Sequence, residues 1–126
     1  MAEYRYTRDH EWVLRDGNRA KIGISSFAQE ELGDIAYVEL PDVGMQIVKG
    51  QTACSIDSLK ASSEIFAPVS GTVGEVNERL RKEEDCGIIN EDPLGEGWIF
   101  SLEMTDSAEW ESLMKEDEYN RYTDSL

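Results

Sequence analysis

Short segments of alternating apolar and polar residues recur along the chain and predict a protein built mainly of β-strands. In segment 35–40, Ala36, Val38 and Leu40 fall on one side, which is the two-residue period of a half-buried strand. Short strands at such spacing are typical of an all-β sandwich or flattened barrel. Similar segments occupy residues 51–57, 63–67, 72–76 and 98–104.

Turn and cap residues predict one hairpin and one short helix near the start of the chain. Asp16-Gly17-Asn18 separates the apolar segments 11–14 and 19–24, and Asp-Gly supplies the positive φ of a tight hairpin turn. A short helix is predicted over 27–32, because Ser26 and Gln29 have the spacing of a capping box. Gly33 then follows where a left-handed helix end is easiest for glycine.

The end of the chain has a helical period instead. Asp106 and Glu109 have the spacing of a helix cap, and Trp110, Leu113 and Met114 lie at i, i+3 and i+4. We therefore expect a C-terminal helical tail over about 106–122, packed outside the sheet. With a typical domain size of roughly 100–200 residues, the 126 residues are expected to form a single domain, 1–126.

Composition and charge exclude several classes of partner. Twelve basic and 27 acidic residues give a net charge of −15, which repels nucleic acids and anionic membrane surfaces. No apolar run approaches the ~20 residues of a membrane span, and the start lacks a signal peptide, so a cytoplasmic protein is expected. A single histidine and two cysteines without a CxxC spacing predict no metal site.

Lys60 is the one residue whose setting suggests chemistry. Segment 56–64 predicts two strands meeting at a turn tipped by residues 58–61, from which Lys60 projects into solvent. By composition alone, an exposed lysine is an ordinary solubilising charge. The surrounding motifs favour a different interpretation.

A dense, ordered series of motifs surrounds Lys60 and extends over nearly the whole chain. The motifs are His10-Glu11-Trp12, Ile22-Gly23-Ile24, Phe27-Ala28-Gln29-Glu30-Glu31-Leu32-Gly33-Asp34, Tyr37-Val38-Glu39-Leu40-Pro41, Ser58-Leu59-Lys60-Ala61, Ala67-Pro68-Val69-Ser70-Gly71, Asn90-Glu91-Asp92-Pro93 and Gly95-Glu96-Gly97-Trp98. Through them the chain, from about Tyr4 to Tyr122, resembles the lipoyl-carrying H proteins of the glycine cleavage system. These proteins have the biotinyl/lipoyl-carrier (hammerhead) fold, so the resemblance implies a flattened β-barrel or sandwich with short peripheral helices and a C-terminal helix.

The resemblance implies that Lys60 carries covalent lipoic acid, attached by a lipoate ligase or lipoyl transferase. It further implies a non-catalytic carrier that shuttles an aminomethyl group among three enzymes. These partners are a pyridoxal-phosphate glycine decarboxylase, a tetrahydrofolate-dependent aminomethyltransferase and dihydrolipoyl dehydrogenase. In such a system the cofactors and partner enzymes perform the reactions.

The resemblance also implies a surface cleft in which the loaded arm is protected from water. Glu11 is the candidate to hold the amine by a charge-assisted hydrogen bond, and the alternative is an ordinary acid at a strand edge. Glu31 occupies a position where some family members carry a histidine that touches the arm. His10 is interpreted as a structural residue and not as an acid or base catalyst.

Three departures from the family pattern leave other functions open. Asp57 and Leu59 replace the usual Glu and Val before the lysine, and the segment 79–87 is about two residues longer than usual. Cys86 in that segment is either a thiol that exchanges with the arm or an incidental loop cysteine, whereas Cys54 is expected in the core. The alternative functions are an H-like lipoate-binding protein carrying sulfur intermediates in a heterodisulfide-reductase-like complex, and an interaction module with unmodified Lys60.

Overall fold

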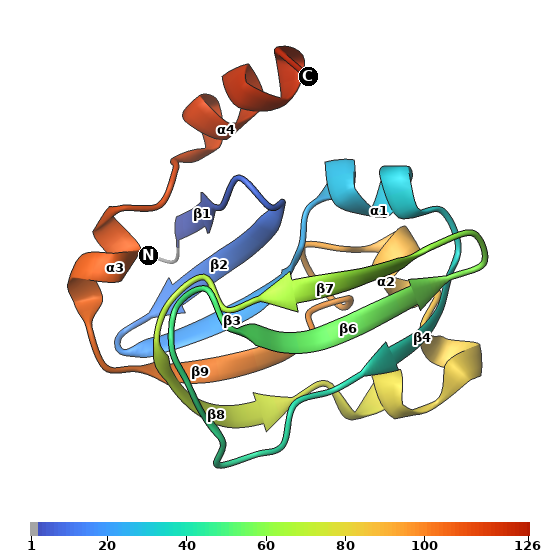
Figure 1. Cartoon of the computed structure of the whole chain (residues 1–126), viewed down its shortest axis with the longest axis horizontal. Coiled ribbons are helices and arrows are strands. Elements are labelled where there is room, and N and C mark those ends of the chain that lie inside the picture. Colours follow the sequence, from blue (N-terminus) through green and yellow to red (C-terminus); the bar gives the residue numbers. More distant parts are fainter. Residues whose placement is uncertain (1–2) are drawn as a thin grey trace.

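The computed structural model describes residues 3–126, which form two antiparallel sheets with short helices around them (Figure 1). A six-stranded sheet has the order β1-β2-β3-β9-β8-β5, and a three-stranded sheet has the order β4-β6-β7. The two sheets do not join into a closed barrel. The predicted mainly β fold is confirmed in its sandwich form.

The strands are β1 (Glu3–Tyr6), β2 (Glu11–Asp16), β3 (Arg19–Ile24), β4 (Ile35–Glu39), β5 (Gln46–Ile47), β6 (Thr52–Ser58), β7 (Ser62–Phe66), β8 (Gly71–Val76) and β9 (Phe100–Met104). The helical segments are α1 (Ser26–Leu32), η1 (Glu78–Arg81), η2 (Glu83–Asp85), α2 (Ile88–Glu91), α3 (Ser107–Glu111) and α4 (Glu116–Asp124).

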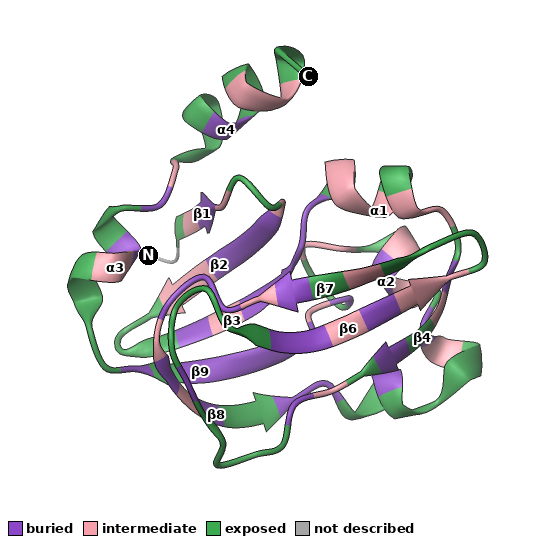
Figure 2. Ribbon diagram, in the orientation of Figure 1, coloured by how far each residue is buried: buried purple, intermediate pink, exposed green. Residues whose placement is uncertain are grey.

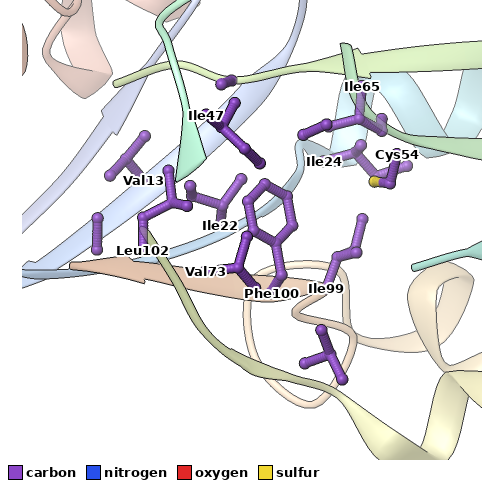
Figure 3. Packing of buried hydrophobic residues seen from close by; sticks show 14 of the residues in the cluster. Val13, Ile22, Ile24, Ile47, Cys54, Ile65, Val73, Ile99, Phe100 and Leu102 are labelled. Atoms are coloured by element: carbon purple, nitrogen blue, oxygen red, sulfur yellow. The ribbon is translucent and has the colours of Figure 1, made fainter. Parts of the chain in front are cut away.

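The main core lies between the two sheets. Phe100 and Ile22 of the larger sheet are completely buried and face Ile65 and Cys54 of the smaller one (Figure 3). Buried residues concentrate in the strands, whereas the turns and much of α3 and α4 are exposed (Figure 2). Alternation of apolar and polar residues therefore builds both layers, as the sequence predicts.

The first hairpin is confirmed, and the first helix differs in its cap. Strands β2 and β3 pair up to Asp16 and Arg19, and Gly17 in the turn has a φ of 63°. Helix α1 is capped by Ser25 and not by Ser26: the Ser25 Oγ accepts a hydrogen bond from the Ala28 amide at 3.2 Å. Two adjacent serines offer the same chemistry, and the backbone selects the first one because it is extended (ψ 166°).

The C-terminal tail contains two helices separated by an extended segment. Asp106 caps α3, as predicted, but this helix ends before Leu113 and Met114. Met114 instead exchanges two backbone hydrogen bonds with Tyr6 of β1, at 2.8 and 3.0 Å. Pairing with the sheet edge thus interrupts the helical period that the sequence shows.

A second, aromatic cluster holds α4 next to β1. The Tyr119 ring stacks on Tyr6 with centroids 4.4 Å apart, and fully buried Trp12 completes the cluster. Within residues 3–126, no helix has both the length and the apolarity needed to cross a membrane. The same residues contain no group of three or more His, Cys, Asp or Glu side chains placed to hold a metal ion.

Candidate functional site

The hairpin formed by β6 and β7 carries Lys60 at its tip. The two strands pair up to Asp57 and Ser62, so that the residues between them form the turn. The tip projects toward the end of the molecule at which α1 lies (Figure 1), and Lys60 in this turn is exposed. In the described part of the chain, the Lys60 ammonium makes no hydrogen bond or ion pair.

Ser58 fixes the shape of this turn. Its amide donates to the Ala61 carbonyl at 2.8 Å, and its Oγ accepts from the amides of Ala61 and Lys60 at 3.0 and 3.3 Å. The Leu59 amide donates to the Asp34 carbonyl at 3.0 Å, which ties the turn to the segment before β4. The backbone that presents Lys60 is therefore fixed, while the side chain remains free at its end.

A surface cleft of about 340 Å³ lies between α1 and β7. Strand β7, which lines the cleft, follows directly on the turn that carries Lys60. The Lys60 side chain lies beside Gly33 at the end of α1, so close that a Cβ at position 33 would be 3.5 Å from the lysine Cε. Apolar and acidic side chains line the cleft: Asp9, His10, Ile24, Phe27, Ala28, Glu31, Leu32, Ser63, Glu64 and Ile65.

Glu11 is buried and does not line this cleft. Its carboxylate accepts from the Thr7 hydroxyl at 2.7 Å and from the Phe66 amide at 3.2 Å, and 1% of the residue is exposed. It borders a neighbouring cavity of about 280 Å³ next to Phe66, and Asp9 lines both hollows. Glu11 is the first residue of β2 and pairs with Ile24 of β3, and its role toward an amine stays a prediction.

Burial raises the pKa of Glu11 to about 7, against an ordinary value of 4.5. The unfolded chain loses this proton near pH 4.5, whereas the folded protein keeps it until about pH 7. Folding stability therefore falls as pH rises across that window and is constant above it. A tenfold change in an acid constant corresponds to about 1.4 kcal/mol, so the loss is about 3 kcal/mol.

We predict that Glu11→Gln removes this pH dependence. Glutamine has nearly the same shape and stays neutral. From pH 5 to pH 8, the free energy of unfolding of the variant relative to wild type should therefore rise by about 2.5 kcal/mol. Urea denaturation at both pH values measures the difference. If the free energies of unfolding of the two proteins differ by the same amount at both pH values, the raised pKa of Glu11 is contradicted. Glu103→Gln, at an exposed position on β9, serves as the control.

Glu31 and His10 both line the cleft. Glu31 is exposed on α1 and lines the cleft, so the structure places it beside the path from Lys60 but apart from Glu11. His10 is half-buried, and its Nδ1 lies 2.8 Å from the Tyr119 hydroxyl oxygen. Burial lowers the pKa of His10, which favours its neutral form and agrees with a structural role.

Neither cysteine is available for exchange with an arm. Cys86 is completely buried, and its thiol donates to the carbonyl oxygens of Leu80 and Lys82 at 3.4 and 3.5 Å. Burial raises the pKa of both thiols, to about 12 for Cys54. Because exchange needs an accessible thiolate, the interpretation of Cys86 as an exchanging thiol is wrong, and it is a core residue of the longer loop.

Sequence reasoning missed Asp9 and Thr7, which the structure brings to the site. Asp9 contributes a carboxylate to both cavities, and Thr7 binds the Glu11 side chain. Their closeness in sequence to His10 and Glu11 was the one feature that could have pointed to them. Asp9 is exposed in a turn, and only the folded chain shows that this turn faces β7.

Comparison with known proteins agrees with this architecture. A family model described as Glycine cleavage H-protein matches residues 4–126. The glycine cleavage system H protein of Thermotoga maritima is 46% identical over 122 residues, which are 97% of this chain and 97% of that protein. The H protein of Xanthobacter autotrophicus is 44% identical over 126 residues, covering 100% and 99% of the two chains.

A solved structure gives the same result. The crystal structure of a glycine cleavage system H protein from Mycobacterium marinum matches with a TM-score of 0.84 and 34% identity, over 98% of each chain. The resemblance inferred from the motifs is thus confirmed. The chain belongs to the glycine cleavage H-protein family.

Proposed function

We propose that this protein is the lipoyl carrier of glycine cleavage and that lipoic acid is attached through an amide bond to the Lys60 ε-amine. The observation that carries the proposal is the free, exposed amine on a hairpin turn fixed by Ser58. A ligase that recognises folded shape meets the amine at a reproducible position. A flexible arm on a rigid base then reaches several partner sites at high effective concentration.

The cleft between α1 and β7 suits such an arm. Ile24, Phe27 and Ile65 offer apolar surface to an aliphatic chain, and Asp9 and Glu64 offer carboxylates to an amine. When attached, the lipoyl group supplies the sulfur chemistry by which a one-carbon amine is accepted and released. The protein's own residues bind the arm, limit access of water and keep the cargo in place.

Glu11 is the proposed partner of the aminomethyl cargo. Its high pKa in the free protein reflects burial without a counter-charge, and an ammonium ion placed beside it favours the ionised carboxylate. Asp9 connects the arm cleft to the cavity of Glu11 and provides a second carboxylate on that path. Glu31 is proposed as a contact at the entrance of the cleft.

The proposed partners are the glycine decarboxylase, the aminomethyltransferase, dihydrolipoyl dehydrogenase and the enzyme that attaches lipoate. The protein itself performs no catalysis in this proposal. Its net charge of −15 favours basic surfaces on these partners and steers the encounter at low salt.

Reconstitution tests this function. Lipoylated protein mixed with the three enzymes is expected to support glycine-dependent release of CO2 and reduction of NAD. Failure of fully lipoylated protein in this assay, with active partner enzymes and a known H protein as control, would contradict glycine cleavage and favour the sulfur-carrying alternative. Complete absence of lipoylation would favour the unmodified module.

We predict that Glu11→Gln makes the loaded carrier release formaldehyde and ammonia faster. Loss of a hydrogen bond to a charged group costs roughly 1.5–3 kcal/mol, which corresponds to about a 10- to 100-fold faster release. Formaldehyde trapping over time measures the rate, again with Glu103→Gln as the control. A wild-type rate in the Glu11 variant would remove this residue from the proposal.

A further inference from the structure

The C-terminal helix α4 is hydrogen-bonded to two groups beside the arm cleft through one hydroxyl. The Tyr119 oxygen lies 2.8 Å from His10 Nδ1 and 2.7 Å from Ser25 Oγ. His10 lines the cleft, and Ser25 caps α1, whose residues also line it. A single side chain thus joins His10 to α1 from a helix outside the sandwich (Figure 1).

We infer that Tyr119 is a positioning residue for the cleft that receives the lipoyl arm, because its hydroxyl joins His10 to the cap of α1. This inference rests on the proposed carrier function. It extends that function to α4, which lines neither the arm cleft nor the cavity of Glu11.

The three polar side chains are hydrogen-bonded in a row. Ser25 Oγ accepts from the Ala28 amide and shares a second hydrogen bond with the Tyr119 hydroxyl, in which either oxygen can donate. The Tyr119 hydroxyl shares another with His10 Nδ1, whose direction follows the histidine tautomer. Ser25 is buried, so loss of the Tyr119 oxygen leaves its hydroxyl without this partner inside the protein. The N-terminus of α1 and His10 therefore depend on the same oxygen.

His10 has a backbone conformation that needs such support. Its φ of 72° is the only positive value outside glycine in the described residues, and it directly precedes Glu11. Its carbonyl accepts from the Ser25 amide at 2.8 Å, and its ring packs on Phe27 with centroids 4.6 Å apart. Backbone and ring together link the start of β2 to α1.

The position of Tyr119 is itself well fixed. Its ring stacks almost parallel on Tyr6, at an interplanar angle of 7°, and 5% of the residue is exposed. Removal of the hydroxyl alone keeps this stacking. Tyr119→Phe therefore tests the hydrogen bonds without removing the helix.

Tyr119→Phe is compared with two control variants. Tyr122→Phe removes another hydroxyl of α4, which donates to the Arg8 carbonyl at 3.2 Å and makes no hydrogen bond to His10 or Ser25. The Tyr122 ring, which stacks on His10 with centroids 5.9 Å apart, is kept in this variant. Val73→Ala reduces stability in the main core, away from the cleft. Three quantities are measured: the 15N signals of the His10 ring, amide exchange of Ala28 and Phe66, and cargo release.

The single histidine of the chain makes the ring signals unambiguous. In unmodified Tyr119→Phe protein, the His10 signals should shift and the amides of Ala28 and Phe66 should exchange faster. In the loaded carrier, release should be roughly 3- to 10-fold faster, which corresponds to a weakening of arm binding by about the net free energy of one ordinary hydrogen bond. Both control variants should keep the wild-type His10 signals and release rate.

Two results would overturn the inference. One is a Tyr119→Phe protein with wild-type exchange at both amides and wild-type release. The other is Val73→Ala releasing cargo as fast as Tyr119→Phe, which would make global stability the cause. If wild-type protein takes up no lipoyl group, the proposed carrier function fails, and Tyr119 then has no role toward a lipoyl arm. The amide exchange rates of Ala28 and Phe66 in unmodified protein still decide whether Tyr119 holds the residues of the cleft in place.

Discussion

Lys60→Arg is expected to abolish both lipoylation and glycine-dependent turnover while leaving the fold unchanged. Arginine keeps the positive charge and the length of the side chain, but its guanidinium stays protonated and cannot form the amide. The side chain is exposed and makes no polar contact in the described residues, so stability should change by less than about 0.5 kcal/mol. Mass spectrometry, turnover and urea denaturation measure the three effects.

Lys82→Arg is the matched control. Lys82 is also exposed but lies at the end of η1, away from the β6–β7 hairpin. This variant should be lipoylated at Lys60 and support turnover at the wild-type rate. Turnover by Lys60→Arg, or a lipoyl group on Lys82, would contradict the assignment.

Phe100→Ala should have the largest effect on stability. The ring is completely buried between the two sheets, where it faces residues of β6 and β7 (Figure 3). Truncation of a buried phenylalanine leaves a cavity and costs roughly 3–5 kcal/mol. Because the hairpin that bears Lys60 forms one side of this core, lipoylation should slow under conditions where the variant is partly unfolded.

Urea denaturation measures the loss, with Val43→Ala as the control. Val43 is 61% exposed, so its truncation should cost less than about 0.5 kcal/mol. A loss below about 1 kcal/mol for Phe100→Ala would show that the sheets do not depend on this ring.

Much of the sandwich follows from alternation in the sequence, because one face of each sheet is buried. Strands β6, β7, β8 and β9 lie within one or two residues of the predicted segments. Alternation of apolar and polar residues does not predict strand β1. Its residues, such as Arg5, are charged or aromatic and depend on the C-terminal tail for burial. Arg5 is buried and donates to the Leu113 carbonyl at 3.2 Å.

The site is only partly predictable, because some of its contacts are local in the sequence and others are not. The turn that carries Lys60 is local, so its place at the tip of a hairpin follows from the sequence. The relation between Glu11 and Glu31 is not local: α1 and β7 place them in adjoining cavities. The burial of Glu11 depends on β7, whose Phe66 is 55 residues further along the chain.

The C-terminal tail shows how tertiary contacts override a helical period. Apolar spacing predicts one continuous helix, but Met114 pairs with Tyr6 and divides the tail. That division directs α4 toward β1 and brings Tyr119 to His10. Neither contact leaves a pattern in the sequence, since each joins segments more than a hundred residues apart.

The mass of the protein after coexpression with a lipoate ligase decides whether Lys60 carries a lipoyl group. We expect a single lipoyl increment, placed on Lys60 by fragmentation of the peptide that contains it and absent from Lys60→Arg. Wild-type protein without the increment, or with the group on another lysine, would contradict the assignment of Lys60.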